Sequence, residues 1–572
     1  MAVSETTPAV SNGVAQVAPE KPEPIKKLHG REFYNSIGCP KYIVAPMVDR
    51  SEFAWRMLTR SFMTPEESKS LLSYSPMFHA RLFEEHAGYR AQAYHPTRAW
   101  ASNKDKGDDA PYLDGNPAID RPLFVQFCSN DPNEFLAAAR HVAPYCDAVD
   151  LNLGCPQGIA KKGHYGAFLQ EDWDLIYKLI NKLHTELPIP VTAKFRIQES
   201  KEKTLEYAKM ILSAGASIIT LHGRTREQKG HNTGLADWSY IRYLRDNLPP
   251  DTVIFANGNC LNHDDIARCL EATGADGVMS AEGNLSDPSI FAKPPPVGSE
   301  GREYWRGRDG KGGYRIDAVF RRYLDIIYKY VLEQPVPERQ PLYIPGDPEE
   351  PAPSESLTDT NTTAPEAEAQ AQAENQEGEG DGEEEEEGPP KKKQKKQSKK
   401  ELKKEKQNQK LPHKFRRAHP NSASIKYMQA HLFQLFRPLI ATHTNVRDAL
   451  ARSTPNDMST FENTLSVLEE ETKKGLKEYE QFPDRFEHKP DPSLTGSKAT
   501  IAEYGRPFWV CQPHIRPTPE EAMEAGALQV KKSEKQKKQE AENGTDGAEV
   551  RTAPAQAVDA ADTAAKDALL SG

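Results

Sequence analysis

The sequence predicts an α/β fold, a (β/α)8 TIM barrel followed by a small α-helical domain. Eight short apolar runs rich in β-branched residues lie between residues 42 and 279. Most of them lack polar alternation, as strands buried on both faces do. Amphipathic patterns separate several runs, and eight βα units over about 250 residues match the size of this barrel. A doubly wound sheet is the alternative, but eight even units without a nucleotide fingerprint favour a closed barrel.

The barrel elements follow one another in chain order. We expect strands at residues 42–47, 73–78, 122–127, 148–153, 191–197, 217–221, 253–256 and 277–279. Helices are expected at residues 134–142, 172–183, 204–213 and 264–273. Asp131 before Pro132 and Asn262 are typical helix starts, and Gly215 and Gly274 are typical helix ends. Residues 81–120 exceed an ordinary loop and are expected to form an insertion.

Composition divides the chain outside the barrel into helical and low-complexity segments. Apolar residues recur at helical spacing over 314–334, 425–439 and 461–479, whereas 345–411 has almost no large apolar residue. We therefore expect a disordered tail over 1–30, the catalytic barrel over 31–300 and a helical domain formed by 312–340 and 412–485. A disordered acidic and basic insertion is expected over 345–411, and a C-terminal extension over 486–572 that is largely disordered after 525.

Cysteine usage and hydropathy exclude several classes of protein. The seven cysteines are scattered without a Cys-x-x-Cys pair, which argues against a disulfide framework or a structural metal site. This usage predicts a reducing compartment, cytoplasmic and/or nuclear. No apolar run approaches the roughly 20 residues that span a bilayer, and the first residues lack the apolar core of a secretory signal. We expect no membrane association and no metal.

The net charge of −10 conceals blocks of opposite charge. Five consecutive glutamates at 383–387 precede a lysine-rich run over 391–410, and a second basic stretch covers 531–538. Such blocks indicate nucleic-acid binding, nuclear import or solvation alone, and the sequence does not choose among them.

One cysteine lies where chemistry is expected. Cys155 belongs to Asn-Leu-Gly-Cys-Pro at 152–156, directly after the fourth expected strand. Gly154 gives the turn backbone freedom, and Pro156 fixes φ just beyond it. Cys39 occupies the same Gly-Cys-Pro tripeptide but precedes the first strand. Because residues after the strands line the active face of such a barrel, Cys155 is the candidate, and Cys39 is expected to pack in the fold.

Polar or reactive residues follow most of the expected strands. Lys194 and Arg196 lie inside the fifth strand, where two cations need an anion or an electron-rich partner. Glycine-bearing segments after the last two strands, 257–259 and 281–284, are typical of a phosphate site. The absence of G-x-G-x-x-G after a strand and of a Walker A sequence excludes a Rossmann-bound dinucleotide and a P-loop nucleotide. Flavin mononucleotide (FMN) fits, because Lys194 near its pyrimidine edge would stabilise the reduced ring.

Six motifs then appear in order, namely Ala-Pro-Met-Val at 45–48, Asn-Leu-Gly-Cys-Pro at 152–156, Ala-Lys-Phe-Arg at 193–196, Leu-His-Gly-Arg-Thr at 221–225, Ala-Asn-Gly at 256–258 and Gly-Val-Met at 277–279. In these motifs the chain resembles the tRNA-dihydrouridine synthase family over about residues 40–290. Lys-Lys-Gly-His-Tyr-Gly at 161–166 and Met-Ser-Ala-Glu-Gly-Asn at 279–284 resemble the eukaryotic class acting on uridines 16 and 17 of the D-loop. Many bacterial relatives carry Gly-Arg where this chain has Ala281-Glu282, so phosphate binding there should use backbone amides.

The resemblance implies a mechanism and a set of contacts. Reduced by NADPH or NADH, FMN passes hydride to C6 of uracil, and the Cys155 thiol donates a proton to C5 from the opposite face. The uridine must leave its stack to reach the ring. Asn152 and Arg196 are implied on the uracil edge, and Arg224 either holds RNA phosphate or shapes its loop. The implied cofactor contacts are Pro46, Met47, Val48, Gln126, Lys194, His222, Asn257, Gly258, Asn259, Ala281 and Glu282.

The expected partner is the D-loop of tRNA, bound by a monomer of this chain. A basic, aromatic-bearing segment is expected to face the RNA, unless it is an ordinary solvated helix face. Its members are Lys414, Arg416 and Arg417, together with Lys426, His431 and Arg437.

Two other functions stay open at this point. A flavin barrel enzyme that reduces a small molecule, such as a dihydroorotate or old-yellow-type reductase, would share the phosphate site without needing basic helices. An RNA-binding protein with a decayed barrel would not need Cys155, Lys194 and His222 together.

Overall fold

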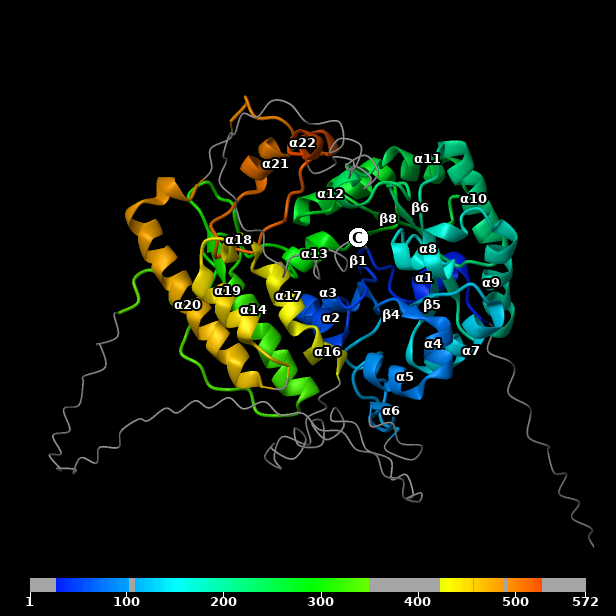
Figure 1. Cartoon of the computed structure of the whole chain (residues 1–572), viewed down its shortest axis with the longest axis horizontal. Helices are drawn as coiled ribbons and strands as arrows, with labels where there is room; N and C mark the ends of the chain where they lie inside the picture. Colours follow the sequence, from blue (N-terminus) through cyan, green and yellow to red (C-terminus); the bar gives the residue numbers. More distant parts are fainter. Residues whose placement is uncertain (1–26, 102–108, 349–421, 456, 488–490, 527–572) are drawn as a thin grey trace, which may run out of the picture. The chain divides into compact units, whose positions relative to one another are not determined.

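The chain forms a closed barrel of eight parallel strands surrounded by helices (Figure 1). The computed structural model describes residues 27–101, 109–348, 422–455, 457–487 and 491–526. The barrel strands are β1 (Tyr42–Val44), β2 (Leu71–Tyr74), β4 (Leu123–Cys128), β5 (Ala148–Leu153), β6 (Val191–Arg196), β7 (Ile219–His222), β8 (Ile254–Asn257) and β9 (Gly277–Ser280). The barrel closes because β1 pairs with both β2 and β9, and β2 also pairs with β4. The expected (β/α)8 barrel is confirmed.

The second strand differs from its expected bounds. The run at 73–78 divides into the end of β2 and the short strand β3 (Phe78–His79), which pairs with β4. Pro76 lies between them, and a proline has no N–H to donate to a strand ladder. Apolar composition alone does not show this break.

The four helices expected in the barrel are confirmed, and their ends follow local chemistry. Asp131 caps α7 by accepting from the backbone N–H groups of Asn133 and Glu134. Asn262 forms a capping box with Asp265 at the start of α12, and Gly274 ends that helix at φ +65°. The barrel region contains α1 (Gly30–Ser36), α2 (Phe53–Arg60), α3 (Pro65–Lys69), α7 (Pro132–Val142), α8 (Gly158–Gly163), α9 (Trp173–Glu186), α10 (Lys201–Ser213), α11 (Ser239–Asn247), α12 (His263–Thr273) and α13 (Glu282–Ser286), with 3-10 turns η1 (Ala143–Tyr145), η2 (Gly166–Leu169) and η3 (Gly230–Asn232).

The expected insertion and the expected tails are described in part. Residues 81–120 carry α4 (Ala80–Glu85), α5 (Ala87–Ala93) and α6 (Arg98–Ala101). Most positions where disorder is expected lie outside the described residues. The exceptions are residues 27–30, 345–348 and 526. In the first of these, Lys27 donates to the carbonyls of His184 (2.8 Å) and Leu187 (3.0 Å). The ordered barrel region therefore begins before residue 31.

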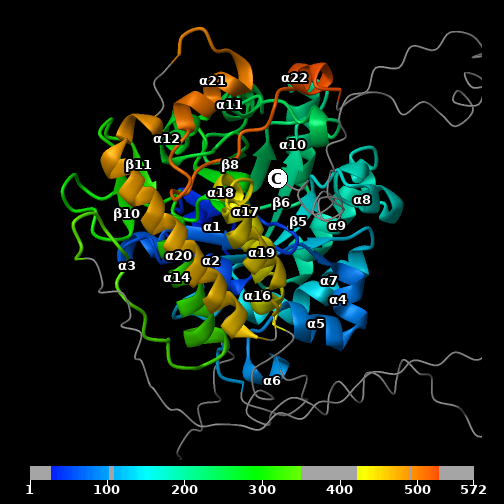
Figure 2. The ribbon, with the colours of Figure 1, turned by 60° about the vertical axis from the view of Figure 1, so that its left-hand side comes forward.

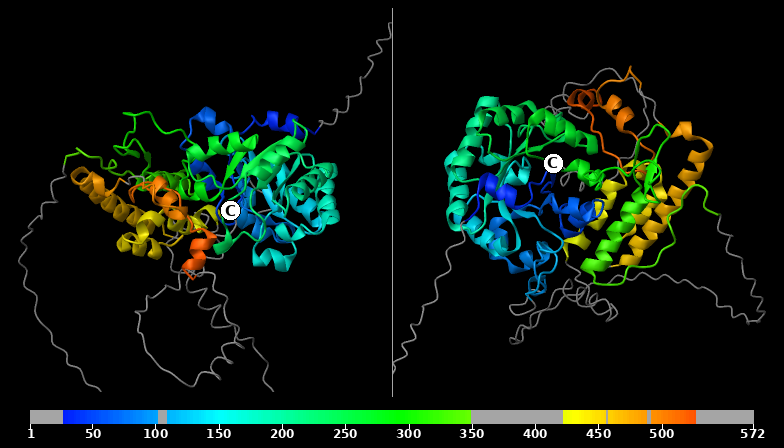
Figure 3. Two further views of the ribbon diagram at one scale, coloured as in Figure 1. Left: turned by 90° about the horizontal axis from the view of Figure 1, so that it is seen from above. Right: turned by 180° about the vertical axis from the view of Figure 1, so that it is seen from behind.

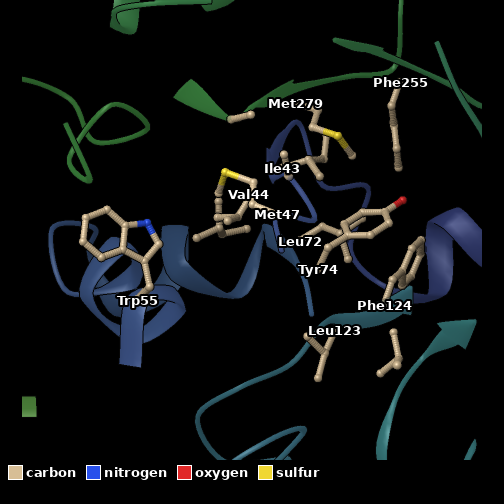
Figure 4. Packing of buried hydrophobic residues seen from close by; sticks show 14 of the residues in the cluster. Ile43, Val44, Met47, Trp55, Leu72, Tyr74, Leu123, Phe124, Phe255 and Met279 are labelled. Atoms are coloured by element: carbon tan, nitrogen blue, oxygen red, sulfur yellow. The ribbon is translucent and has the colours of Figure 1, made fainter. Parts of the chain in front are cut away.

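The barrel interior is packed with large apolar side chains, as Figure 4 shows for β1, β2, β4, β8 and β9. Tyr74 of β2 meets Phe124 of β4 edge to face, with ring centroids 5.3 Å apart. Both rings are fully buried. This filled interior fixes the strand ends, where the candidate site residues lie.

Helices after the barrel form the second part of the fold. They are α14 (Ile316–Ile326) with the π-helical η4 (Ile327–Val331), α16 (Ala423–Lys426), α17 (Met428–Leu435), α18 (Arg437–Ile440), α19 (Thr444–Arg452), α20 (Met458–Gln481), α21 (Gly496–Tyr504) and α22 (Pro519–Glu524). A hairpin of β10 (Tyr304–Arg306) and β11 (Gly312–Tyr314) precedes α14, and the turn η6 (Pro483–Arg485) follows α20. α14 and α20 lie side by side, green and orange in Figure 3. The helix expected at 461–479 is confirmed within α20, whereas 425–439 forms three short helices instead of one.

The barrel and these helices belong to one compact unit, Met1–Leu342 with Pro420–Gly572. In the second unit, Tyr343–His419, the described residues contain a turn in which Ile344 N–H donates to Asp347. Within the first unit, His431 of α17 stacks on Trp55 of α2, with centroids 4.1 Å apart. Its Nε2 lies 2.7 Å from a carboxylate oxygen of Glu52. No described helix is long and apolar enough to cross a membrane.

Candidate active site

The candidate residues meet where the barrel strands end. A small cavity is lined by Pro46, Val48, Met77, Gln126, Asn152, Gly154, Cys155, Pro156, Lys194, Arg196 and His222. A larger cavity of about 580 Å³ shares Arg196 and His222 and extends along Arg224, 257–261 and 279–283. Its volume falls in the range of small-molecule sites. Of the cofactor contacts expected in the barrel, Met47 alone lines neither cavity, because its side chain packs in the core (Figure 4).

Cys155 lies on the turn after β5 with its side chain almost wholly buried. Cys128, Ala160 and Tyr165 form an apolar cluster with it. Burial raises the pKa of the Cys155 thiol, so the thiol is protonated at neutral pH. The backbone at Gly166 approaches the Cys155 turn closely, because a Cβ on Gly166 (φ +64°) would lie 2.8 Å from the Cys155 carbonyl oxygen. Only glycine fits there without a shift of the backbone.

A chain of hydrogen bonds fixes the Cys155 turn from the barrel interior. The Asp150 carboxylate accepts from Gln126 Nε2 at 2.8 Å, which orients the amide so that its Oε1 accepts from Asn152 Nδ2, also at 2.8 Å. Asn152 Oδ1 in turn accepts from the backbone N–H groups of Gly154 (3.1 Å) and Cys155 (2.9 Å). Asn152, expected on the uracil edge, thus uses its oxygen to hold the turn and keeps one N–H for another partner.

Lys194 provides a cation at the same end of the site. Its ammonium group makes no hydrogen bond to a described residue, and it lines the small cavity. Burial, together with repulsion from Arg196, lowers the pKa of Lys194 to about 8, although Asp150 and Cys155 oppose the shift. A lysine held this way is mostly charged at neutral pH and is available to an electron-rich group in the cavity.

The two arginines expected to touch substrate bind protein carbonyls. Arg196 Nε donates to Gly154 O at 2.8 Å, and its Nη1 donates to Thr225 O at 2.9 Å. Arg224 donates to Gly234 O from Nε and Nη2 at 3.1 and 3.0 Å, and to His222 Nε2 at 3.0 Å. Both therefore shape the loops that wall the cavity. Of the two expected roles for Arg224, this geometry favours loop shaping.

His222 is neutral at this position. Burial lowers its pKa well below the ordinary value, and the charges of Arg196, Lys194 and Arg224 lower it further. A neutral imidazole can accept the hydrogen bond from Arg224 and direct its other ring nitrogen to a different partner.

The far end of the large cavity is formed by the segments expected to hold phosphate. Gly258 adopts φ +114°, and a Cβ there would lie 2.6 Å from Ala236 Cβ, so glycine is required. Asn257 Nδ2 donates to Met279 O at 3.0 Å, whereas its buried Oδ1 has no donor among the described residues. Glu282 at the start of α13 forms an ion pair with Arg516.

These features fit the three parts of FMN. Lys194 lies at the end where a flavin ring would need positive charge. The orphaned Asn257 Oδ1 calls for a donor, which a ribityl hydroxyl supplies. At the opposite end the cavity contains the guanidinium groups of Arg224 and Arg516, which suit a phosphate.

Part of the cavity wall comes from residues that the strand-end argument did not find. Ser497, Thr500 and residues 514–520 of the C-terminal extension line the large cavity. Local sequence did contain one signal, because Thr518 and Glu521 have the spacing of a capping box and form one at the start of α22. Nothing local indicated where that helix would dock.

Three expectations need correction. Cys39 is exposed rather than packed, in a turn where it adopts φ +50°. Gly154 needs no special backbone freedom, because a Cβ there would make only ordinary contacts, the nearest at 3.6 Å. His431 is fully buried against Trp55 and does not face solvent, let alone RNA.

Asn152, expected on the uracil edge, lines the small cavity, and its oxygen also accepts from the Cys155 turn. Lys414, Arg416 and Arg417, expected in the RNA interface, lie outside the described residues. Lys426 is exposed and Arg437 is half-buried.

Comparison with known proteins gives consistent matches. The family described as Dihydrouridine synthase (Dus) matches residues 43–302. The chain is 41% identical to the tRNA-dihydrouridine(16/17) synthase [NAD(P)(+)] of Schizosaccharomyces pombe, over 86% of this chain and 92% of that protein. It is 38% identical to the protein of the same name from Saccharomyces cerevisiae, over 86% and 88% of the two chains. A mouse protein named as similar to this enzyme is 45% identical over 49% of this chain and 54% of its own.

The first of these alignments extends far beyond the barrel and includes nearly the whole relative. With the closed barrel, the buried cysteine after β5 and the basic residues of β6 in place, this chain belongs to the dihydrouridine synthase family.

Proposed function

We propose that this chain is an FMN-dependent tRNA-dihydrouridine synthase that reduces uridines 16 and 17 of tRNA with NADPH or NADH. The names of the yeast relatives support the substrate, the positions and the nicotinamide reductant. One observation in the site carries the chemistry: the protonated thiol of Cys155 and the ammonium group of Lys194 line the same cavity. A uracil ring placed between them, as the hydride acceptor, would face the proton donor Cys155 on one side.

The reaction needs a hydride, a proton and a uracil held between their sources. When bound, FMN would supply the hydride that C6 of the uracil receives. Cys155 donates its proton to C5, and its raised pKa keeps that proton available at neutral pH. Lys194 holds positive charge at the ring end of the site. The chain from Asp150 through Gln126 and Asn152 keeps the Cys155 turn in place during the transfer.

The target uridine must leave the base stack, and cations that follow the Cys155 motif or contact it suit the flanking phosphates. Lys161 and Lys162 are exposed on α8, which begins two residues after Pro156. Lys229 donates to the carbonyl of Pro156 at 2.8 Å, next to Cys155. The ammonium groups of these lysines would bind the backbone phosphates of an extruded nucleotide. The basic residues from 414 to 417 would supply further affinity for the tRNA.

Mapping dihydrouridine in tRNA from cells that lack this protein tests the proposal. Loss of the modification at positions 16 and 17, restored by the wild-type chain and not by Cys155→Ala, is the expected result. Retention of both modifications would contradict it. Unchanged tRNA together with flavin-dependent reduction of a small molecule would favour the alternative enzyme class.

A further inference from the structure

The lining of the large cavity, taken as a whole, has an excess of positive charge. Its lining includes the cations Arg196, Arg224, Lys229 and Arg516 and the carboxylates Glu282 and Glu520. The two histidines of the lining add no charge, because burial lowers the pKa of both His222 and His514, the latter to about 4. The lining thus carries four positive and two negative charges. A phosphate monoester, with nearly two negative charges at neutral pH, balances this excess.

The charges of the far end come from two distant parts of the chain. Arg224 belongs to the loop after β7, whereas Arg516 belongs to the C-terminal arm, which we define as residues 512–520. The guanidinium of Arg224 feels attraction from Glu282 and repulsion from Arg516, which places all three near one another. Arg437 of α18 is close as well, since it and Arg516 both lower the pKa of His514. Like charges converge in this way where an anion is bound.

The C-terminal arm is held firmly at both ends. Before it, Trp509 is fully buried, and its carbonyl accepts from Ile316 N–H at 2.8 Å. Cys511 N–H donates to Tyr314 O at 2.9 Å. At its end, the capping box of Thr518 and Glu521 fixes the start of α22, and Glu521 also accepts from Ser497 N–H at 3.0 Å. Figure 2 shows α21 near α12, whose Arg268 donates to Tyr504 of α21, and residues 514–520 line the large cavity. The arm is therefore part of the site wall.

We propose that the C-terminal arm completes the phosphate subsite of the flavin site, with Arg516 as the residue that binds the phosphate. This inference rests on the proposed function, because it takes the FMN phosphate as the anion. Glu282 orients the guanidinium through its ion pair, and Arg516 in return neutralises a carboxylate that would repel the phosphate. The matched family region ends at residue 302, so the arm adds to the barrel a contact from outside it.

Pairing with Glu282 makes the loss of Arg516 costly in two ways. Arg516→Ala removes a charge-assisted hydrogen-bond donor and leaves the Glu282 carboxylate facing the phosphate. One such bond accounts for about a 10- to 100-fold change in affinity. We expect Arg516→Ala to weaken FMN binding by at least this factor and to leave riboflavin binding unchanged, because riboflavin has no phosphate. Adding Glu282→Gln to Arg516→Ala should recover part of the FMN affinity.

The test is titration of the flavin-free, full-length protein with FMN and with riboflavin, followed by quenching of flavin fluorescence. Lys498→Ala is the matched control, because it removes an exposed cation from α21 that does not line the cavity. Wild type should prefer FMN over riboflavin, Lys498→Ala should keep the preference, and Arg516→Ala should lose it. If Arg516→Ala does not fold, Arg516→Lys serves instead, because it retains the charge but lacks the paired N–H donors of the guanidinium group. It should bind FMN with intermediate affinity.

The outcomes separate this inference from the proposed function. The role of the arm would be overturned if Arg516→Ala, or Arg516→Lys where the alanine variant does not fold, kept the full wild-type preference for FMN over riboflavin. That result would leave the proposed flavin enzyme intact. Failure of the wild-type protein to bind either flavin would overturn the proposed function itself.

Discussion

Replacing Cys155 with alanine removes one buried sulfur atom and changes little else in the structure. The backbone N–H of residue 155 still donates to Asn152 Oδ1, and its carbonyl still accepts from Ala167 N–H. Lys194 and the flavin side of the cavity are untouched. The lost packing costs about 1 kcal/mol of stability. The loss of a general acid lowers the rate of uridine reduction by roughly 10²–10⁴-fold, which is about 3–5 kcal/mol of barrier.

The assay separates the two half-reactions in one preparation. NADPH oxidation without tRNA reports on the flavin, and dihydrouridine formed per tRNA reports on proton donation. Cys155→Ala should keep the first and lose the second, whereas Cys39→Ala, which changes an exposed side chain before β1, should keep both. Wild-type dihydrouridine formation by Cys155→Ala would refute the assignment, and so would a dependence on Cys39 instead.

The site makes three further predictions. Lys194→Met should weaken FMN binding about tenfold. The affinity of the wild-type protein for FMN should fall as pH rises through about 8, where Lys194 loses its charge, whereas the variant should show no such step. Identical pH profiles of the two proteins in flavin titrations would contradict this. Gly258→Ala should destabilise the fold by about 1–3 kcal/mol, because φ is +114° and the new Cβ would lie 2.6 Å from Ala236 Cβ; an unchanged thermal midpoint would count against the described loop. Replacing Arg416 and Arg417 together with glutamine should raise the Kd for tRNA and reduce its salt slope by roughly 1–2 with NADPH oxidation intact, and a wild-type affinity and slope would remove this segment from the RNA interface.

The barrel was predictable because strands buried on both faces leave continuous apolar runs in the sequence. The exception, at 73–78, shows what composition omits: Pro76 interrupts the ladder although its neighbours are apolar. Strand ends were equally informative for the site, since a closed parallel barrel gathers them at one face. That rule predicts Cys155, Lys194 and His222 at one face, and the three side chains line one cavity.

Long-range pairing was beyond the reach of sequence patterns. Arg516 and Glu282 are separated by 234 positions, and no local period connects them. His431 shows the converse error, because a basic segment suggested a solvent-facing side chain, yet the ring stacks on Trp55 in the interface between α2 and α17. The hydrogen bonds that Asn152 and Arg196 make to nearby amides and carbonyls were not predicted either, because they depend on turn geometry.

The central claim is that this chain itself reduces uridines 16 and 17 of tRNA with a flavin and Cys155. The most direct test incubates the purified full-length protein and FMN with NADPH and an unmodified tRNA transcript, then maps dihydrouridine at every position. We predict dihydrouridine at positions 16 and 17 with the wild-type protein and none above background with Cys155→Ala. Dihydrouridine at other positions only, or none with a flavin-loaded wild-type protein, would contradict the claim.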